Sequence, residues 1–384
     1  MSARDHLFIH PLLASDQSHA GYLCVHTPDT DPAARVQQLI EAALWPQFPS
    51  RLPWFVPATL ACASQTRLTA VFDAVPGDEA GQALRARLRQ AGSRTAVRLQ
   101  PGQPLPVAGD WDDLLLRCSH ARSLPPLSLS ILATHSRLVL LEVSCHADHE
   151  WLKKGGLPLG TDEYLLTSQN GRHTADTARS HLLHLLSLIA EDASTGELEA
   201  IFRQEPKLAY ALLRLVNSAA VAPRVPITCF GQAINLLGRR QLQRWLQLLV
   251  YADPDNGQRP NPLLQKAAAR GQLLALLSEG LSLPAELEHP ADAAFMVGSF
   301  SLLDVLLHRP LPDILEELTL APAVHQALAE QGGVLGQLLA ALQLAERGRH
   351  GEASERLTGL GIEPDDHLQA QLATLYWARS IQPD

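Results

Sequence analysis

The pattern of hydrophobic and polar residues changes near residue 170. Before that point, short and nearly continuous apolar runs recur, with helical patterns between several of them. Such runs are typical of parallel strands that are covered on both faces. The predicted strands are 6–10, 21–26, 53–60, 67–75, 93–99, 113–119, 137–143 and 162–168, and the predicted helices are 32–44 and 78–92. This half therefore predicts an α/β barrel or a fragment of one.

The segment between Thr59 and Arg67 is too short to hold a crossover helix. A parallel pair of strands needs a connection of about a dozen residues, which is usually a helix. Either one helix of a complete barrel is missing, or one pair of strands is antiparallel. We therefore expect an eroded (β/α) barrel.

After residue 170 the strand patterns stop. A polar, turn-rich segment at 167–180 is followed by apolar residues spaced three and four apart, with Pro or Gly between the segments. The predicted helices are 177–192, 206–218, 231–238, 239–252, 262–280, 290–308, 323–330, 333–347, 350–359 and 365–380. We predict an α/β domain at 1–170 and an all-helical domain at 171–384, since 384 residues exceed the usual size of one hydrophobic core.

Composition narrows the class of protein. With 46% hydrophobic and 18% charged residues, the chain is globular. No stretch approaches the roughly 18 apolar residues of a membrane span, and the first residues do not resemble a signal peptide. We expect a cytoplasmic protein without membrane contact. The five scattered cysteines lack a CxxC pair and predict reduced thiols.

Net charge bears on nucleic-acid binding. The formal charge of −9 divides into −2 for residues 1–170 (14 basic, 16 acidic) and −7 for residues 171–384 (17 basic, 24 acidic). A protein that binds mainly phosphates needs clustered Lys and Arg, and the one modest cluster is Arg239, Arg240 and Arg244. We interpret this cluster as a solvated helix face, so a nucleic-acid partner is not expected.

The helical half resembles the HDOD domain. The resemblance rests on the run 205–250, which contains LLRLVNSA, an Arg-containing turn and AINLLG, and on the downstream runs 289–328 and 333–348. It covers residues 174–384 and implies an output or interaction module related to the HD phosphohydrolases. An HD site needs a His-Asp doublet to present an imidazole and a carboxylate to the same metals. None of the 16 histidines is followed by Asp, so we expect no hydrolysis by this half.

The first half resembles the EAL domain, in a degenerate form. Where that family has GYELLFR, this chain has GYLCVHT at 21–27, so Leu23 replaces a metal-binding Glu and Thr27 replaces an Arg that contacts the cyclic dinucleotide. A leucine side chain cannot bind Mg²⁺. The other replaced positions are Arg98 and Leu99 for paired aspartates, Leu116 and Cys118 for Lys and Asp, and Leu141 and Ser144 for two glutamates.

The two resemblances together imply a bacterial signalling protein that is not an enzyme, with no catalytic, ligand-binding or metal-binding residues and no cofactor. We expect it to act as a signal-transduction or scaffolding protein that contacts other signalling proteins, with a possible homo-oligomer. Two alternatives stay open: a degenerate cyclic di-GMP receptor that binds without hydrolysis, and a nucleic-acid binder. The candidate partner-contact residues are Arg224, Arg239, Arg240 and Arg244.

Two further clusters could hold zinc. Cys145, His146 and His149 lie close in sequence, and Cys118 with His120 would come near them if their strands are adjacent. Neither group has the spacing typical of zinc sites, and we prefer a structural interpretation. We interpret the pair His181 and His184, three residues apart on one helix, in the same way.

Overall fold

The computed structural model of the protein describes residues 5–27, 31–167, 187, 244, 247–248, 262–285, 287, 289–316, 318 and 320–381. The chain forms two compact units. We call them the barrel unit (Met1–Thr167, Leu344–Glu355 and Glu363–Gln369) and the helical unit (Ser168–Gln343, Arg356–Ile362 and Ala370–Asp384). Two segments near the C-terminus thus belong to the barrel unit, and the domain boundary at residue 170 stays a prediction.

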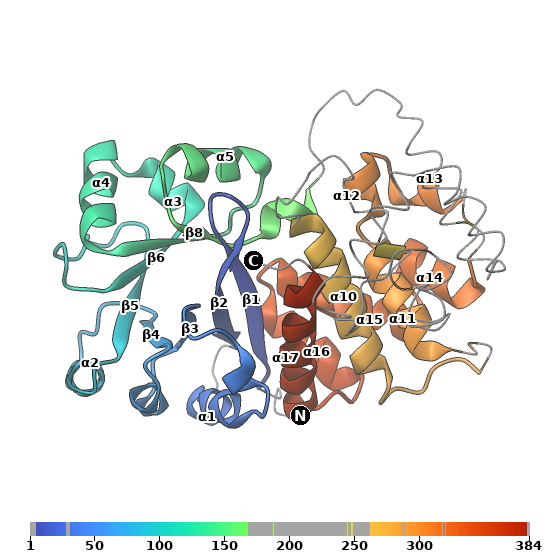
Figure 1. Ribbon diagram of the computed structural model, residues 1–384, viewed down its shortest axis with the longest axis horizontal. Coiled ribbons are helices and arrows are strands. Elements are labelled where there is room, and N and C mark those ends of the chain that lie inside the picture. The colour runs from blue at the N-terminus through green and yellow to red at the C-terminus, as the bar shows by residue number, and fades with distance from the viewer. Residues whose placement is uncertain are drawn as a thin grey trace, which may run out of the picture. The chain divides into compact units, whose positions relative to one another are not determined.

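Eight strands form a closed barrel in which neighbours follow the order of the sequence (Figure 1). Strand β1 is antiparallel to β2 and β8, and all other pairs are parallel. The predicted α/β barrel is therefore confirmed. The strands are β1 (Leu7–Leu13), β2 (His19–His26), β3 (Trp54–Pro57), β4 (Leu68–Phe72), β5 (Arg94–Leu99), β6 (Asp113–Arg117), β7 (Arg137–Leu141) and β8 (Leu159–Gly160).

The closed barrel lacks a full helix between two of its parallel strands. Strands β3 and β4 are parallel, yet only the 3₁₀ turn η2 (Leu60–Ser64) lies between them, as the short segment predicted. The antiparallel pairs are at β1 instead. The other helices of this part are α1 (Ala33–Glu41), η1 (Trp45–Gln47), α2 (Glu79–Gln90), α3 (Cys118–Ser123), α4 (Pro126–His135) and α5 (His146–Lys154).

The prediction of a last strand at 162–168 is wrong. These residues contain the 3₁₀ helix η3 (Glu163–Leu166), and the eighth strand is the two-residue Leu159–Gly160. A short apolar run does not by itself distinguish a strand from a helical turn. At Gly160 a Cβ would lie 2.6 Å from Leu152 Cδ1, so a residue without a side chain allows this close approach.

Apolar side chains fill the barrel interior. Each strand contributes at least one, and they form one cluster: Leu12, Leu23, Phe55, Val71, Ala96, Leu115, Val139, Leu141 and Leu159. Successive side chains of a strand point to opposite faces, so interior positions recur every second residue. Fully burying a Leu or Phe side chain contributes roughly 1.5–3 kcal/mol, and this cluster is therefore a major source of stability for the unit.

Polar contacts fasten the amino ends of neighbouring strands. Asp113 begins β6 and its side chain is fully buried. It accepts hydrogen bonds from Arg94 Nε and Nη2, at 3.2 and 3.0 Å, and from Arg137 Nε. Asp112 Oδ2 accepts a 2.8 Å bond from the backbone N–H of Thr95. The adjacent aspartates therefore join β5, β6 and β7 at their amino ends.

The later helices are close to those predicted. They are α10 (Pro262–Ser278), α11 (Pro290–Phe300), α12 (Leu303–Leu307), α13 (Leu311–Leu315), α14 (Pro322–Glu330), α15 (Gly333–Glu346), α16 (His350–Gly359) and α17 (Pro364–Ile381). The predicted helix 290–308 consists of two helices, α11 and α12, and α13 was not predicted. Apart from single residues, the four helices predicted between 177 and 252 lie outside the described residues.

Helices α10 and α11 pack closely through glycines. A Cβ at Gly298 would lie 2.6 Å from the Cα of Gly271, which explains why small residues occupy this crossing. The segment 290–307 is long and apolar enough to cross a membrane, but 61% of it is buried inside the protein. A core helix passes the same test of length and composition, so this segment is weak evidence for a membrane span.

Candidate functional site

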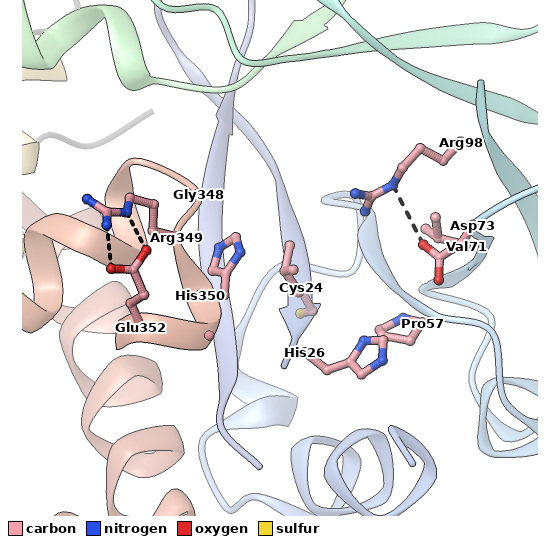
Figure 2. A pocket seen from close by; sticks show the side chains of 12 residues that line it. Cys24, His26, Pro57, Val71, Asp73, Arg98, Gly348, Arg349, His350 and Glu352 are labelled. Carbon is pink, nitrogen blue, oxygen red and sulfur yellow. Dashed lines mark hydrogen bonds and ion pairs between the residues drawn. The ribbon is translucent and has the colours of Figure 1, made fainter. Parts of the chain in front are cut away.

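A cavity of about 580 Å³ lies where the carboxyl ends of β2, β3, β4 and β5 meet. One side is formed by residues at or just after strand ends, such as His26, Asp73 and Arg98, and the other by residues 348–352, which lead from the link after α15 into the first turn of α16 (Figure 2). We call these the mouth cavity and the mouth turn. The carboxyl ends of barrel strands are where α/β barrels carry their binding and catalytic groups. All of these residues belong to the barrel unit.

Arg98 is the main cation that the strands contribute. It lies two residues after the interior residue Ala96 on β5, so its side chain is on the interior face of the strand. Its Nε lies 3.7 Å from Asp73 Oδ1, and the Asp73 side chain is 77% exposed. Among the described residues, Arg98 Nε is buried without a hydrogen-bond acceptor. This donor is therefore available to a ligand in the cavity.

The mouth turn contributes a second cation and two further polar groups. Arg349 donates through Nε and Nη2 to the two carboxylate oxygens of Glu352, as the dashed lines in Figure 2 show. Asp73 and Glu352 thus neutralise much of the charge of Arg98 and Arg349. His350 also lines the cavity, with its Nε2 2.8 Å from His10 Nε2 on β1.

The pKa of His350 is far below the usual value. Burial of the ring is the largest cause, and the neighbouring His10 and Arg98 lower the pKa further, to about 3. The ring is therefore neutral at physiological pH. It can share one proton with His10 in an N–H···N hydrogen bond and adds no charge to the cavity.

Of the eight degenerate EAL positions, Arg98 alone lines the mouth cavity. Leu23 and Leu141 lie in the interior cluster, and Leu99 and Leu116 are buried. The remaining three side chains make local contacts: Thr27 Oγ1 pairs with the backbone of His6, Ser144 Oγ donates to Asp148, and Cys118 is buried at the start of α3. That these eight positions are replaced metal- and dinucleotide-binding residues stays a prediction.

Several residues of the mouth were missed from the sequence. His26 and Asp73 stand at or just after strand ends, and this position was a usable signal. Glu142, which follows β7, has φ 55° and lies 3.3 Å from Arg117 Nε through Oε1. A non-glycine residue in the left-handed region is uncommon, and such strain concentrates near functional sites. No local sequence pattern indicates that Arg349 and His350 lie at the barrel mouth.

The groups considered for zinc make other contacts. The His149 ring stacks on Tyr164 at 4.5 Å, and His146 Nε2 lies 3.2 Å from the Thr167 carbonyl oxygen. Burial raises the pKa of the Cys118 thiol to about 12. Within the described part of the chain, no group of three or more His, Cys, Asp or Glu could hold a metal ion. His181 and His184 lie outside that part.

Of the four candidate partner-contact residues, the structure describes Arg244, while Arg224, Arg239 and Arg240 lie outside the described residues. Arg244 Nε donates to Asp292 Oδ1 at 2.9 Å, and its guanidinium lies 5.1 Å from the centre of the Phe295 ring. The side chain of Arg244 therefore contacts α11 within the helical unit. A substitution there would disturb the packing of the unit as well as any partner surface.

Residues 180–322 match the family model of the HDOD domain. The chain therefore carries an HDOD domain, as its resemblance to that family predicted. It is 31% identical over 183 residues to the cyclic di-GMP phosphodiesterase CdgJ of Vibrio cholerae, which is 48% of this chain and 41% of that protein. It is 27% identical over 200 residues to the uncharacterized protein YuxH of Bacillus subtilis, 51% of this chain and 47% of that protein. The chain spans less than half the length of these two relatives.

Two solved structures resemble part of the chain. The EAL-like domain protein YdiV matches with a TM-score of 0.33 and 10% identity, over 41% of this chain and 90% of that chain. The YkuI protein of Bacillus subtilis, which has an EAL domain and was solved in complex with its substrate c-di-GMP and calcium, matches with a TM-score of 0.34 and 14% identity. That match covers 60% of this chain and 72% of the YkuI chain.

One prediction needs correction. The loss of EAL and HD motif residues led to the expectation that the chain is not an enzyme, but the relative CdgJ is named a phosphodiesterase. That expectation does not stand. The prediction compared single residues with the family motifs, and such a comparison does not account for groups that other parts of the chain bring to the barrel mouth.

Proposed function

We propose that this chain acts in cyclic di-GMP signalling, with the mouth cavity as the site for the cyclic dinucleotide. The observation that carries the proposal is the Arg98 guanidinium, which lines the cavity and whose buried Nε has no hydrogen-bond acceptor among the described residues. The HDOD domain and the similarity to the cyclic di-GMP phosphodiesterase CdgJ support the choice of signalling system.

The chemistry of the cavity suits a phosphate-bearing ligand. A guanidinium donates two parallel hydrogen bonds to a phosphate, and such charge-assisted bonds are stronger than neutral ones. Arg98 Nε lies 3.7 Å from Asp73 Oδ1. An exposed ion pair of this kind contributes little energy, so a phosphate can replace the Asp73 carboxylate as the partner of Arg98. A volume of about 580 Å³ is within the range of small-molecule sites.

Binding is tested by calorimetric titration of the full chain with cyclic di-GMP. We expect a dissociation constant of about 1–10 μM, and Arg98→Ala should weaken binding at least about tenfold, since a hydrogen bond to a charged group contributes roughly 1.5–3 kcal/mol. Arg87→Ala, which changes an exposed arginine on α2, is the matched control. Absence of binding, or equal affinity in the Arg98 and Arg87 variants, would contradict the proposal.

Cleavage is measured separately in the same samples. The protein is incubated with cyclic di-GMP and Mg²⁺ or Mn²⁺, and the products are separated by chromatography with and without a chelator. A linear dinucleotide that forms only with metal would identify the chain as a phosphodiesterase, and unchanged ligand would identify it as a receptor. Both outcomes are compatible with binding at the mouth, which the titration decides.

For the helical half we propose contact with other signalling proteins in the cytoplasm. The support is the HDOD domain and the −7 charge of residues 171–384, which disfavours a phosphate backbone as partner. Arg240→Glu is the variant of choice because Arg244 already contacts Asp292. Signalling proteins captured by the wild type and lost with Arg240→Glu would support the proposal. Nucleic acid bound at physiological salt, with no protein enriched, would contradict it.

A further inference from the structure

Three alternate residues at the start of β1, the first of them His6 just before the strand, contact the two C-terminal segments of the barrel unit. His10 Nε2 lies 2.8 Å from His350 Nε2 at the start of α16, and His6 Nδ1 lies 3.3 Å from His367 Nδ1 on α17. The Phe8 ring lies between these pairs, with ring centres 5.1 Å from His350 and 5.2 Å from His367. Two histidine pairs therefore join β1 to segments about 340 and 361 residues away in the sequence.

A pair of imidazoles in such contact holds one shared proton. One ring nitrogen donates its hydrogen and the other accepts it, so the contact is favourable when both rings are neutral. If both rings are protonated, two N–H groups and two positive charges face each other. The geometry therefore opposes protonation of both rings of a pair, and burial of His350 and His367 opposes a positive charge on either of these two rings.

The charged groups around the pairs do not offset this effect. Near His350 these are Arg98 on β5 and, on the mouth turn, Arg349 and Glu352, which are paired with each other. Near His367 they are His6, just before β1, Glu363, just before α17, and Asp365 and Asp366 in the first turn of α17; Asp365 binds Arg35 of α1 at 2.7 Å. Arg35 also lies 3.8 Å from Asp5.

We propose that the two histidine pairs form an acid-sensitive latch that holds the mouth turn on the barrel as one side of the mouth cavity. His350 is both a member of a pair and a residue that lines the cavity, so release of the pair opens the cavity. This inference does not depend on which ligand the cavity binds.

The direction of the pH effect follows from proton uptake. Burial lowers the pKa of both His350 and His367 to about 3, whereas a released histidine titrates near its ordinary pKa of about 6.5. Below that pH the released state takes up protons that the closed state does not. As the pH falls, the ratio of released to closed chains then rises up to about tenfold per pH unit for each of His350 and His367, and it is constant well above pH 6.5.

The test is hydrogen–deuterium exchange of the full chain at pH 7.5, 6.5 and 5.5, corrected for intrinsic exchange rates. Between pH 6.5 and 5.5, exchange in 344–355 and 363–369 should rise roughly thirtyfold if both pairs release together, and roughly fivefold if they release one at a time. Strand β6 serves as the internal reference. Unchanged protection of the two segments overturns the latch, and so does an equal loss in β6, which would report unfolding of the whole barrel.

A variant separates the latch from other effects of acid. His350→Gln keeps a polar side chain that does not titrate, so the thirtyfold rise should fall to about fivefold, the share of the remaining His6–His367 pair. His135→Gln, which changes an exposed histidine at the end of α4, should behave like the wild type. The same pH dependence in all three proteins would overturn the proposal, and the wild-type profile is decisive if His350→Gln fails to fold.

Discussion

The two ends of the barrel use arginine and aspartate in opposite ways. At the amino ends of β5, β6 and β7, Asp113 is fully buried and hydrogen-bonded by Arg94 and Arg137. At the mouth, Arg98 and Asp73 lie 3.7 Å apart and Asp73 is largely exposed. A buried, fully bonded carboxylate fixes strands together, whereas a loose and exposed pair can exchange its partner for a ligand. The amino ends therefore serve stability, and the mouth is suited to binding.

The largest expected loss of stability comes from a substitution at the amino ends of β5, β6 and β7. Asp113→Ala removes the carboxylate that accepts three hydrogen bonds from Arg94 and Arg137. A hydrogen bond to a charged group contributes roughly 1.5–3 kcal/mol, and the two arginines are partly exposed, so the free energy of unfolding should fall by about 3 kcal/mol in total. Urea unfolding followed by tryptophan fluorescence measures it. A loss below about 1 kcal/mol would show that this end is no more stabilising than the mouth.

The next largest expected effect is a loss of stability at acidic pH, caused by the His6–His367 pair. Burial holds the pKa of His367 at about 3, so its contribution to stability is complete above the unfolded pKa of about 6.5 and is lost as the pH falls toward 3. At pH 5 the loss should be about 2 kcal/mol. Urea unfolding at pH 7 and pH 5 should show a smaller pH dependence for His367→Leu than for the wild type. If the variant and the wild type show equal pH dependence, the His6–His367 pair is not its cause.

A smaller effect is expected from Asp73→Ala. Removing the carboxylate frees Arg98, so cyclic di-GMP should bind about twofold to fivefold more tightly, the range expected from a surface ion pair of about 0.5–1 kcal/mol. The free energy of unfolding should change by less than about 0.5 kcal/mol. Calorimetric titration and urea unfolding of the same preparation give both values. Weaker binding would mean that Asp73 itself contacts the ligand.

The sequence was informative about the fold and less so about the site. Continuous apolar runs identified seven strands, because parallel strands covered on both faces are apolar along their whole length. The eighth strand has only two residues, Leu159 and Gly160, too few to form a pattern. Comparison with family motifs singled out Arg98. The contact of His10 with His350 joins residues 340 positions apart, and local sequence patterns do not report such contacts.

The central claim is that the mouth cavity binds the cyclic dinucleotide, and the most direct measurement is a crystal structure of the full chain with cyclic di-GMP. We expect the ligand at the carboxyl ends of β2–β5, with a phosphate oxygen within about 3 Å of Arg98 Nε, the usual length of a charge-assisted hydrogen bond. A ligand bound elsewhere on the chain, or a mouth that stays empty at saturating cyclic di-GMP, would contradict the claim.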